Sequence, residues 1–249
     1  FEHHGNMIKP IVSEIFKNNP NIWQSELSSD MCIPLQLNNP AANYCKKDTP
    51  QKAFHRKEKH IIEQITEVFG ITNPQLRCEI YLEEKELAEV DSLVRDLDNR
   101  FVTIEPYSNT DYTPNRAYPR DHWQYVVDDL SKHTQVVQVG TSPYLLDGVV
   151  DFRKKTSFRI TCGLIGRSEL FLSTEGGLVH GATAFDTTSI VIITGYQDPR
   201  MVSYPQNKNV FIGKHETCGL KTRCDSCFKE ANNHDPKEIV EIAKECLQM

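Results

Sequence analysis

Hydrophobic and polar positions switch between strand-like and helix-like periods several times in the second part of the chain. Short β-rich apolar runs predict strands at 101–104, 135–139, 170–172, 189–194 and 209–212. Apolar residues at helical spacing predict helices at 119–130, 158–165 and 178–185, and a last helix that starts at Asp235. Because strands and helices alternate in this order, we expect an α/β fold with a parallel sheet that helices cover on both faces.

The first part of the chain is patterned differently. A short helix is predicted from Met7 to Phe16, and the stretch 18–51, rich in Asn, Pro and Ser, is typical of a loop. Two amphipathic helices follow, with apolar stripes that we expect to be core: Ile61, Ile62, Ile65, Val68 and Phe69, then Leu87, Val90, Leu93, Val94 and Leu97. The change of pattern near residue 98 predicts an N-terminal domain of 1–97 and a C-terminal domain of 98–249.

Composition and charge exclude some classes of protein. The chain has 249 residues, 39% of them apolar and 25% charged, as in ordinary globular domains. Its net charge of −6 argues against a nucleic-acid partner, which needs a basic face. No apolar run approaches the roughly 20 residues that span a bilayer, and no export signal is visible, so we expect a cytoplasmic protein.

Ligands of an open parallel sheet bind beyond the carboxyl ends of its strands, and three predicted loops lie at that edge. The first loop, 105–120, carries Arg116 and Arg120. A guanidinium there either reaches a diphosphate or is a solvated surface group. Another follows the most apolar strand and contains Gly195, whose backbone either meets the ligand or only leaves the strand.

The remaining loop, Ser173–Gly177, joins a strand to a helix and contains paired glycines. Gly176 and Gly177 let the backbone approach a ligand, and the N–H groups at the helix start suit a phosphate. The Glu175 carboxylate beside them can hold a ribose or sugar hydroxyl. His180 lies one turn into the helix, where it either contacts the ligand or is a buried histidine with its own partner.

Eight cysteines suggest reduced thiols in a chain without an export signal. Four of them lie near the C-terminus: Cys218, Cys224, Cys227 and Cys246. A Cys-x-x-Cys pair with two further thiols can form a tetrahedral zinc or iron site. The alternative is a set of packed thiols without a metal, because the outer spacing is not that of a standard zinc finger.

Several segments of the second part occur in an order that one known family shares. They are 101–104 with Arg116 to Pro119 and Trp123, 156–158, Glu169 to Ala184, Ser189 to Gly195, and Asp198-Pro199. Taken together over residues 98–249, they resemble glycosyltransferase family 9, the ADP-heptose:lipopolysaccharide heptosyltransferase group. Many members of that family also end with a cysteine cluster and a helix.

The resemblance implies a GT-B arrangement of two Rossmann-like domains with parallel sheets, the N-terminal one shortened here. It implies inverting, metal-independent transfer of a heptose-like or other sugar from a nucleotide-diphosphate sugar to a glycan or lipid-linked acceptor, as in lipopolysaccharide biosynthesis. A lipid-linked acceptor implies peripheral contact with the inner face of the membrane. Carried over by motif, the donor-binding residues are Arg116, Thr174, Glu175, Gly176, Gly177, His180 and Gly195.

Two positions depart from the family's pattern. Glu175 stands where the family usually has Asp, so the charge is kept but displaced. Asn6 stands where the family has its catalytic carboxylate, and an amide cannot act as a general base. Three hypotheses follow: a transferase whose base comes from elsewhere, with Glu2, His3 and His4 nearby; a degenerate protein that binds a nucleotide sugar or glycan without catalysis; and a structural protein held by a metal at the cysteines.

Overall fold

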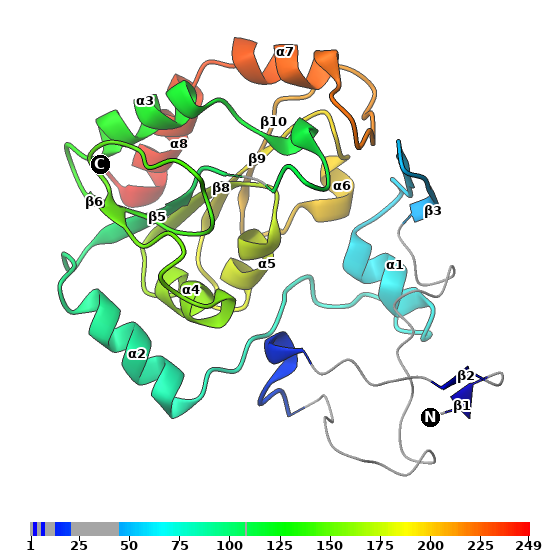
Figure 1. The fold of residues 1–249 in the computed structure, drawn as a ribbon, viewed down its shortest axis with the longest axis horizontal. Coiled ribbons are helices and arrows are strands. Elements are labelled where there is room, and N and C mark those ends of the chain that lie inside the picture. The colour runs from blue at the N-terminus through cyan, green and yellow to red at the C-terminus, as the bar shows by residue number, and fades with distance from the viewer. Residues whose placement is uncertain (1, 4–5, 8–12, 21–44, 108) are drawn as a thin grey trace.

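The computed structural model describes residues 2–3, 6–7, 13–20, 45–107 and 109–249, and most of them surround one sheet (Figure 1). Its strands are β5 (Phe101–Glu105), β6 (Gln135–Gln138), β7 (Val150–Asp151), β8 (Leu170–Thr174), β9 (Ser189–Ile193) and β10 (Lys208–Phe211). The strand order is β10-β9-β8-β5-β6-β7, and every neighbouring pair is parallel. This is the Rossmann-like order, with its switch point between β5 and β8, so the predicted parallel α/β sheet is confirmed.

Alternate residues of the central strands face two separate cores. One core contains Val102, Ile104, Leu170, Leu172, Ile190 and Ile192. The opposite core contains Phe101, Phe171, Val191 and Ile193. Both faces of these strands are therefore buried, which explains why the sequence reads as continuous apolar runs and not as an alternation with polar residues.

Helices cover both faces of the sheet (Figure 1). They are α3 (Arg120–Leu130) and α8 (Lys237–Leu247) on one face, and α4 (Phe158–Ile165) and α5 (Gly177–Thr183) on the other. A further helix, α2 (Glu84–Val94), packs against α4 as an outer layer. The predicted start of α8 is close to the observed one, because Asp235 Oδ1 accepts the Lys237 N–H at 3.0 Å.

Several short elements of the second part were not predicted. They are β7, η3 (Pro114–Arg116), α6 (Pro199–Val202) and α7 (Asp225–Asn233). Two of them start at capping side chains: Thr113 Oγ1 accepts the Asn115 N–H at 3.2 Å, and Asp198 Oδ1 accepts the Arg200 N–H at 3.0 Å. These caps fix the loops at the carboxyl edge of the sheet, where the site lies.

The first part of the chain differs most from the prediction. Between Met7 and Phe16, the described residues form the end of strand β2 (Asn6–Met7), which pairs with β1 (Glu2–His3), and the single turn η1 (Glu14–Phe16). The predicted helix is therefore wrong there, and 8–12 lie outside the described residues. The end of the predicted loop 18–51 forms β3 (Cys45–Asp48), paired with β4 (Ala53–His55), whereas 21–44 lie outside the described residues.

The two amphipathic helices form, but their apolar stripes are less buried than expected. In α1 (Ile61–Glu67), the most buried side chain is Gln64, and Val68 and Phe69 beyond the helix are exposed. In α2 only Val90 is fully buried, and Leu87 is 39% exposed. The domain boundary near residue 98 remains a prediction. Within the described residues, no helix combines the length and the apolar character needed to cross a bilayer.

Candidate functional site

The predicted donor loops meet at the carboxyl edge of the sheet, where β5 and β8 lie side by side. β5 ends at Glu105, whose register partner on β8 is Ser173. The loop after β8 stays attached to the next strand, because the Glu175 N–H donates to Ile192 O at 3.2 Å. The sequence therefore brings its polar loops to the switch point of the sheet, where ligands of this architecture bind.

Arg116 and Glu175 form an ion pair at this edge. Arg116 Nη1 donates to Glu175 Oε2 at 2.9 Å, and the two side chains are only 19% and 10% exposed. The guanidinium carbon lies 5.5 Å from the centre of the Tyr112 ring and 5.7 Å from that of Tyr196. Among the described residues, the buried Arg116 Nε has no hydrogen-bond partner, so the guanidinium retains a donor for a ligand.

A cavity of about 300 Å³ opens beside this ion pair. Five of the predicted donor-binding residues line it: Arg116, Glu175, Gly176, Gly177 and His180. The rest of its wall consists of residues that were not predicted to bind the donor, although Tyr196 and Gln197 belong to the predicted loop after the most apolar strand: His55, Ile61, Tyr112, Tyr196, Gln197 and Val202. The cavity therefore combines one guanidinium, one carboxylate and two aromatic rings, a polar and aromatic lining that suits a nucleotide.

The protein's own packing does not require glycine at the paired positions. A Cβ on Gly176 would meet nothing closer than Thr174 O at 3.8 Å, and one on Gly177 nothing closer than Phe158 Cε2 at 3.6 Å. Gly176 has an extended backbone, with φ of −178°, that any residue can adopt. Packing within the chain therefore does not explain the two glycines, whereas the close approach of a ligand would explain them.

His180 lies in the cavity wall and has a partner of its own. Its Nδ1 is 2.6 Å from the hydroxyl of Tyr204, and the Tyr204 ring packs edge-on against His60 at 4.9 Å. Burial lowers the pKa of His180, and burial lowers that of His60 to about 4. Both imidazoles are therefore neutral at pH 7, so neither adds a positive charge beside Arg116.

Two predicted donor residues do not line the cavity. Thr174 is buried at the end of β8. Gly195 packs against an imidazole instead, because a Cβ there would lie 2.3 Å from His215 Cε1. The glycine at 195 is thus explained by the close packing of His215 and not by a ligand.

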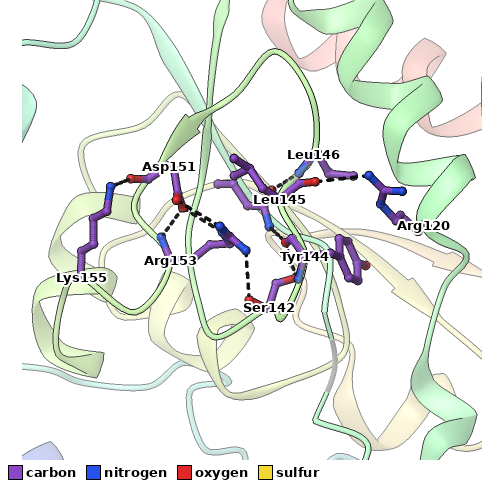
Figure 2. A network of polar contacts seen from close by, with 9 residues as sticks. Arg120, Ser142, Tyr144, Leu145, Leu146, Asp151, Arg153 and Lys155 are labelled. Carbon is purple, nitrogen blue, oxygen red and sulfur yellow. Dashed lines mark hydrogen bonds and ion pairs between the residues drawn. The ribbon is translucent and has the colours of Figure 1, made fainter.

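Arg120 does not join the site either. Its Nη2 donates to Leu145 O at 3.4 Å and its guanidinium lies 5.6 Å from the centre of the Tyr144 ring, in the network that Figure 2 shows. The same network holds Arg153 against Asp151 at 2.8 Å. Arg120 therefore secures the loop after β6, whereas Arg116 alone serves the cavity.

Burial raises the pKa of Glu105 to about 8, and the Ser173 side chain partly opposes this by hydrogen bonding to the carboxylate. The carboxyl lies under Gly140, where a Cβ would approach Glu105 Oε1 to 2.4 Å. Glu105 is therefore protonated over most of the neutral range, a property that the sequence did not indicate.

The structure brings three of the four predicted cysteines together and adds a histidine to them. Ligand atoms of His215, Cys218, Cys224 and Cys227 all lie within 4.8 Å of one another, and we call these four residues the cysteine cluster. Cys246 lies elsewhere, on α8, packed against the sheet core. Its place is taken by His215, which the sequence signals through the spacing His-x-x-Cys followed by Cys-x-x-Cys.

The cluster has the geometry and the orientation of a metal site. Cys227 Sγ lies 3.5 Å from Cys218 Sγ and 3.6 Å from His215 Nε2. His215 Nδ1 lies 2.8 Å from Glu230 Oε2, so a carboxylate orients the imidazole with Nε2 toward the thiols. Hydrogen bonding from Cys227 lowers the pKa of Cys218, which favours the thiolate that a metal would bind. Three sulfurs and one imidazole nitrogen are a donor set that zinc or iron accepts.

Asn115 connects the cluster to the cavity beside the Arg116–Glu175 pair. Its Nδ2 donates to Leu220 O and Thr222 O, and its Oδ1 accepts the Cys224 N–H, all at 2.7 Å. Arg116 is the next residue. The loop that carries the cysteines therefore also holds the residue that pairs with Glu175. The cluster and the cavity are therefore parts of one assembly at the sheet edge.

Asn6, the predicted position of the base, lies in the two-stranded sheet of β1 and β2, where its register partner is His3. That hairpin is separate from the six-stranded sheet. The role of this position remains a prediction.

Solved glycosyltransferases share this fold. A family-9 glycosyltransferase from Veillonella parvula matches with a TM-score of 0.56 at 14% identity, over 78% of this chain and 61% of that one. The ADP-heptose LPS heptosyltransferase II of E. coli matches with 0.54 at 16%, over 72% and 56%. The dodecameric, iron-containing heptosyltransferase TibC of enterotoxigenic E. coli, in complex with ADP-D-beta-D-heptose, matches with 0.63 at 14%, over 82% and 58%.

Comparisons by sequence give no match: no protein-family model fits the chain, and no curated protein is similar to it. The chain spans about six tenths of the length of the structural neighbours. At identities this low, the likeness establishes the fold, which is GT-B-like with a shortened N-terminal part. The neighbours are family-9 glycosyltransferases, and the chain therefore has the fold of the family that its sequence motifs resemble.

Proposed function

We propose that this chain is a glycosyltransferase that moves a sugar, heptose-like or other, from a nucleotide-diphosphate sugar to a glycan or lipid-linked glycan acceptor. The observation that carries the proposal is the half-enclosed Arg116–Glu175 pair in a cavity at the switch point of the sheet. The neighbour solved with ADP-D-beta-D-heptose supports the class of donor. A lipid-linked acceptor would bring the chain to the cytoplasmic face of the membrane as a peripheral protein.

In this proposal each group of the cavity has one role. The Arg116 guanidinium contacts the diphosphate and stabilises the negative charge that develops on the leaving nucleotide. The backbone at Gly176 and Gly177 approaches the phosphate oxygens. Glu175 accepts hydrogen bonds from ribose or sugar hydroxyls, and the neutral His180 lines the cavity beside it. Transfer proceeds with inversion and without a catalytic metal.

Inversion needs a general base that takes the proton of the acceptor hydroxyl, and the Asn6 amide has no basic group. We assign this role to His55, which lines the cavity and whose pKa is lowered by burial. Its imidazole is neutral at pH 7 and able to accept a proton. We expect His55→Gln to lower kcat and leave the KM for the donor unchanged; an unchanged kcat would remove His55 from the mechanism.

We propose that the cysteine cluster holds a structural zinc or iron ion. Its four donors fit a tetrahedral site, and the neighbour TibC is described as iron-containing. Bound there, the ion cross-links the loop that carries Cys218 and Cys224 and takes no part in the transfer. Elemental analysis of the purified chain tests this, since absence of both metals would contradict it.

The proposal is tested by calorimetric titration of ADP and of nucleotide-diphosphate sugars into the whole chain. We expect saturable binding that Glu175→Ala and Arg116→Ala weaken by at least about tenfold, which is about 1.4 kcal/mol. Arg167→Ala is the matched control, because Arg167 pairs with Asp91 at the exposed surface. Absence of binding, or binding that neither variant changes, would contradict the proposal.

A non-catalytic protein that binds a nucleotide sugar or glycan is the second candidate, and the amide at Asn6 is the observation that favours it. The two candidates differ in turnover. Donor binding with no transfer and no donor hydrolysis across a panel of acceptor sugars would favour the binding protein, whereas turnover that Arg116→Ala abolishes would exclude it.

A further inference from the structure

One polar side chain of the donor cavity has no role in the proposed reaction. Gln197 lines the cavity from the loop after β9, and the residue is only 7% exposed. Among the described residues, no hydrogen bond involves its amide. A buried amide without a partner destabilises the folded chain, so its presence in a cavity wall calls for an explanation. The amide remains available to a ligand.

The other two buried glutamines of the described residues do have partners. Gln138 Nε2 donates to Tyr144 O, and Gln138 Oε1 accepts the Leu146 N–H, both at 2.9 Å. Gln64 Nε2 donates to two backbone carbonyls of the segment before α1. These two amides stabilise the backbone around them. Gln197 is the exception, and it is also the buried glutamine that lines the cavity.

The backbone on both sides of Gln197 is fixed. On one side, the Gly219 N–H donates to Tyr196 O at 3.1 Å. On the other side, Asp198 Oδ1 accepts the Arg200 N–H at 3.0 Å and caps α6. A side chain on such a backbone loses little conformational freedom when a ligand binds, which suits a selective contact.

The place of Gln197 in the fold indicates which part of a donor it would contact. The loops that carry Arg116, Glu175 and Gln197 leave neighbouring strands, and β9 lies on the far side of β8 from β5. The His55 ring packs edge-on against the ring of Tyr196, with the ring centres 5.4 Å apart. Because the base must lie near the carbon that is transferred, this end of the cavity suits the sugar of the donor.

The chemistry of the two side chains fits hydroxyl groups. The Glu175 carboxylate only accepts hydrogen bonds, whereas the Gln197 amide both donates and accepts them. A sugar hydroxyl also donates and accepts, so neighbouring hydroxyls can pair with both side chains. An anionic group on the sugar would meet no counter-charge at the neutral amide. The two side chains together therefore match an uncharged sugar with free hydroxyls.

We propose that Gln197 determines which donor sugar the chain accepts, by hydrogen bonding to a hydroxyl of an uncharged sugar. This inference rests on the proposed transferase function, and it adds a residue that selects the sugar. A sugar that lacks this hydroxyl, or has it in the opposite configuration, leaves the buried amide unpaired and binds more weakly. The affinity for ADP itself does not depend on Gln197, because ADP carries no such sugar.

Calorimetric titration of the whole chain with ADP, ADP-glucose, ADP-mannose and ADP-D-beta-D-heptose tests the proposal. We expect the unmodified chain to bind one of the three ADP-sugars more tightly than the others. Gln197→Met keeps the length of the side chain and removes the amide. It should weaken the tightest ADP-sugar by at least about tenfold and leave the affinity for ADP unchanged. Gln75→Met is the control, because it makes the same change at an exposed glutamine that does not line the cavity.

Thermal melting separates a ligand contact from a structural role. Because the amide of Gln197 has no partner among the described residues, Gln197→Met should leave the melting temperature unchanged or raise it. A lower melting temperature would overturn the inference, since the amide would then stabilise the chain itself.

The titrations can also overturn the inference. Equal weakening of ADP and the ADP-sugars by Gln197→Met would show that the amide contacts the nucleotide. Unchanged affinity for all four probes would show that it contacts no part of the donor. Equal affinity of the unmodified chain for the three ADP-sugars would show that no residue selects among them. Failure of the unmodified chain to bind ADP or any ADP-sugar would instead overturn the proposed function, and the role of Gln197 with it.

Discussion

The donor cavity and the cysteine cluster lie at the same edge of the sheet, but they satisfy their polar groups in opposite ways. In the cavity the polar groups have partners within the chain, since Arg116 forms an ion pair with Glu175 and the neutral His180 shares a hydrogen bond with Tyr204. In the cluster, three sulfurs and one imidazole nitrogen converge on one another within 4.8 Å. The first arrangement is stable without a ligand and suits a substrate that comes and goes, whereas the second suits a permanently bound ion.

Asn115 connects the cavity and the cysteine cluster. It bonds the backbone at Leu220, Thr222 and Cys224, and Arg116 follows it directly. We infer that the cluster serves the cavity by holding the loop that presents Arg116.

If the cysteine cluster holds the proposed ion, removing that ion should have the largest effect on stability. With the free ion at roughly a thousand times its dissociation constant, binding adds about 4 kcal/mol to the free energy of unfolding. We expect a chelator, or Cys227→Ser, to remove that amount in denaturant titrations. Cys246→Ser is the control and should respond to the chelator like the unmodified chain. Equal stability of Cys227→Ser and the unmodified chain would show that the cluster holds no ion.

Arg116→Ala should have the largest effect on turnover. In the proposed reaction it removes the cation that stabilises the leaving nucleotide, and loss of one such group lowers kcat by about a hundredfold to a thousandfold. Transfer assays with a nucleotide-diphosphate sugar measure the effect. Thermal melting accompanies them, because Arg116→Ala leaves the largely buried Glu175 carboxylate unpaired and should also lower stability. Turnover within a factor of two of the unmodified chain would exclude Arg116 from the donor site.

Asn115→Ala should affect both regions at once. It leaves the Thr222 carbonyl and the Cys224 N–H without their side-chain partner, whereas Leu220 O keeps the Thr113 hydroxyl, and the loss costs about 1–3 kcal/mol of stability. We also expect the affinity for ADP to fall about tenfold, because Arg116 loses its support. Asn232→Ala removes an amide from the exposed face of α7 and is the control. A loss of stability with unchanged ADP affinity would show that the cluster and the cavity are independent.

Glu105→Gln should reduce the pH dependence of the free energy of unfolding, through a residue that is not part of the cysteine cluster. The folded-state pKa of Glu105 is about 8, above its ordinary value of 4.5, so the folded chain holds a proton that the unfolded chain releases between these values. Stability is therefore greatest below about pH 5 and is lost as the pH rises toward 8. Between pH 6 and 7 the loss is about 1.4 kcal/mol. Denaturant titrations at both pH values should show a smaller loss for Glu105→Gln; an identical slope would contradict the assignment.

The sequence was most informative where local pattern and burial agree. The runs at 170–172 and 189–194 predict strands because both of their faces are buried. The paired glycines and Arg116 could be placed at one edge because carboxyl ends of parallel strands meet there. The hairpin of β3 and β4 could not, since it is held by the backbone at Gly219 and Lys221, far along the chain.

The candidate site shows the same limit. Cys246 has the residue type of a ligand but packs on α8, and His215 took its place because a carboxylate on α7 orients it. Neither fact is encoded by the spacing of the cysteines alone. His55 reaches the cavity from a segment that carries no local motif, and Tyr196 reaches it from a loop in which the sequence singled out only Gly195. Residues that share a site only through tertiary contacts therefore needed the structure.

The central claim is that a nucleotide diphosphate binds between Arg116 and the paired glycines. A crystal structure of the whole chain with ADP tests it most directly. We expect a diphosphate oxygen within hydrogen-bond distance of the Arg116 guanidinium and of the backbone N–H of Gly176 or Gly177. ADP bound elsewhere on the chain, with this cavity open and the Arg116–Glu175 pair unchanged, would contradict the account.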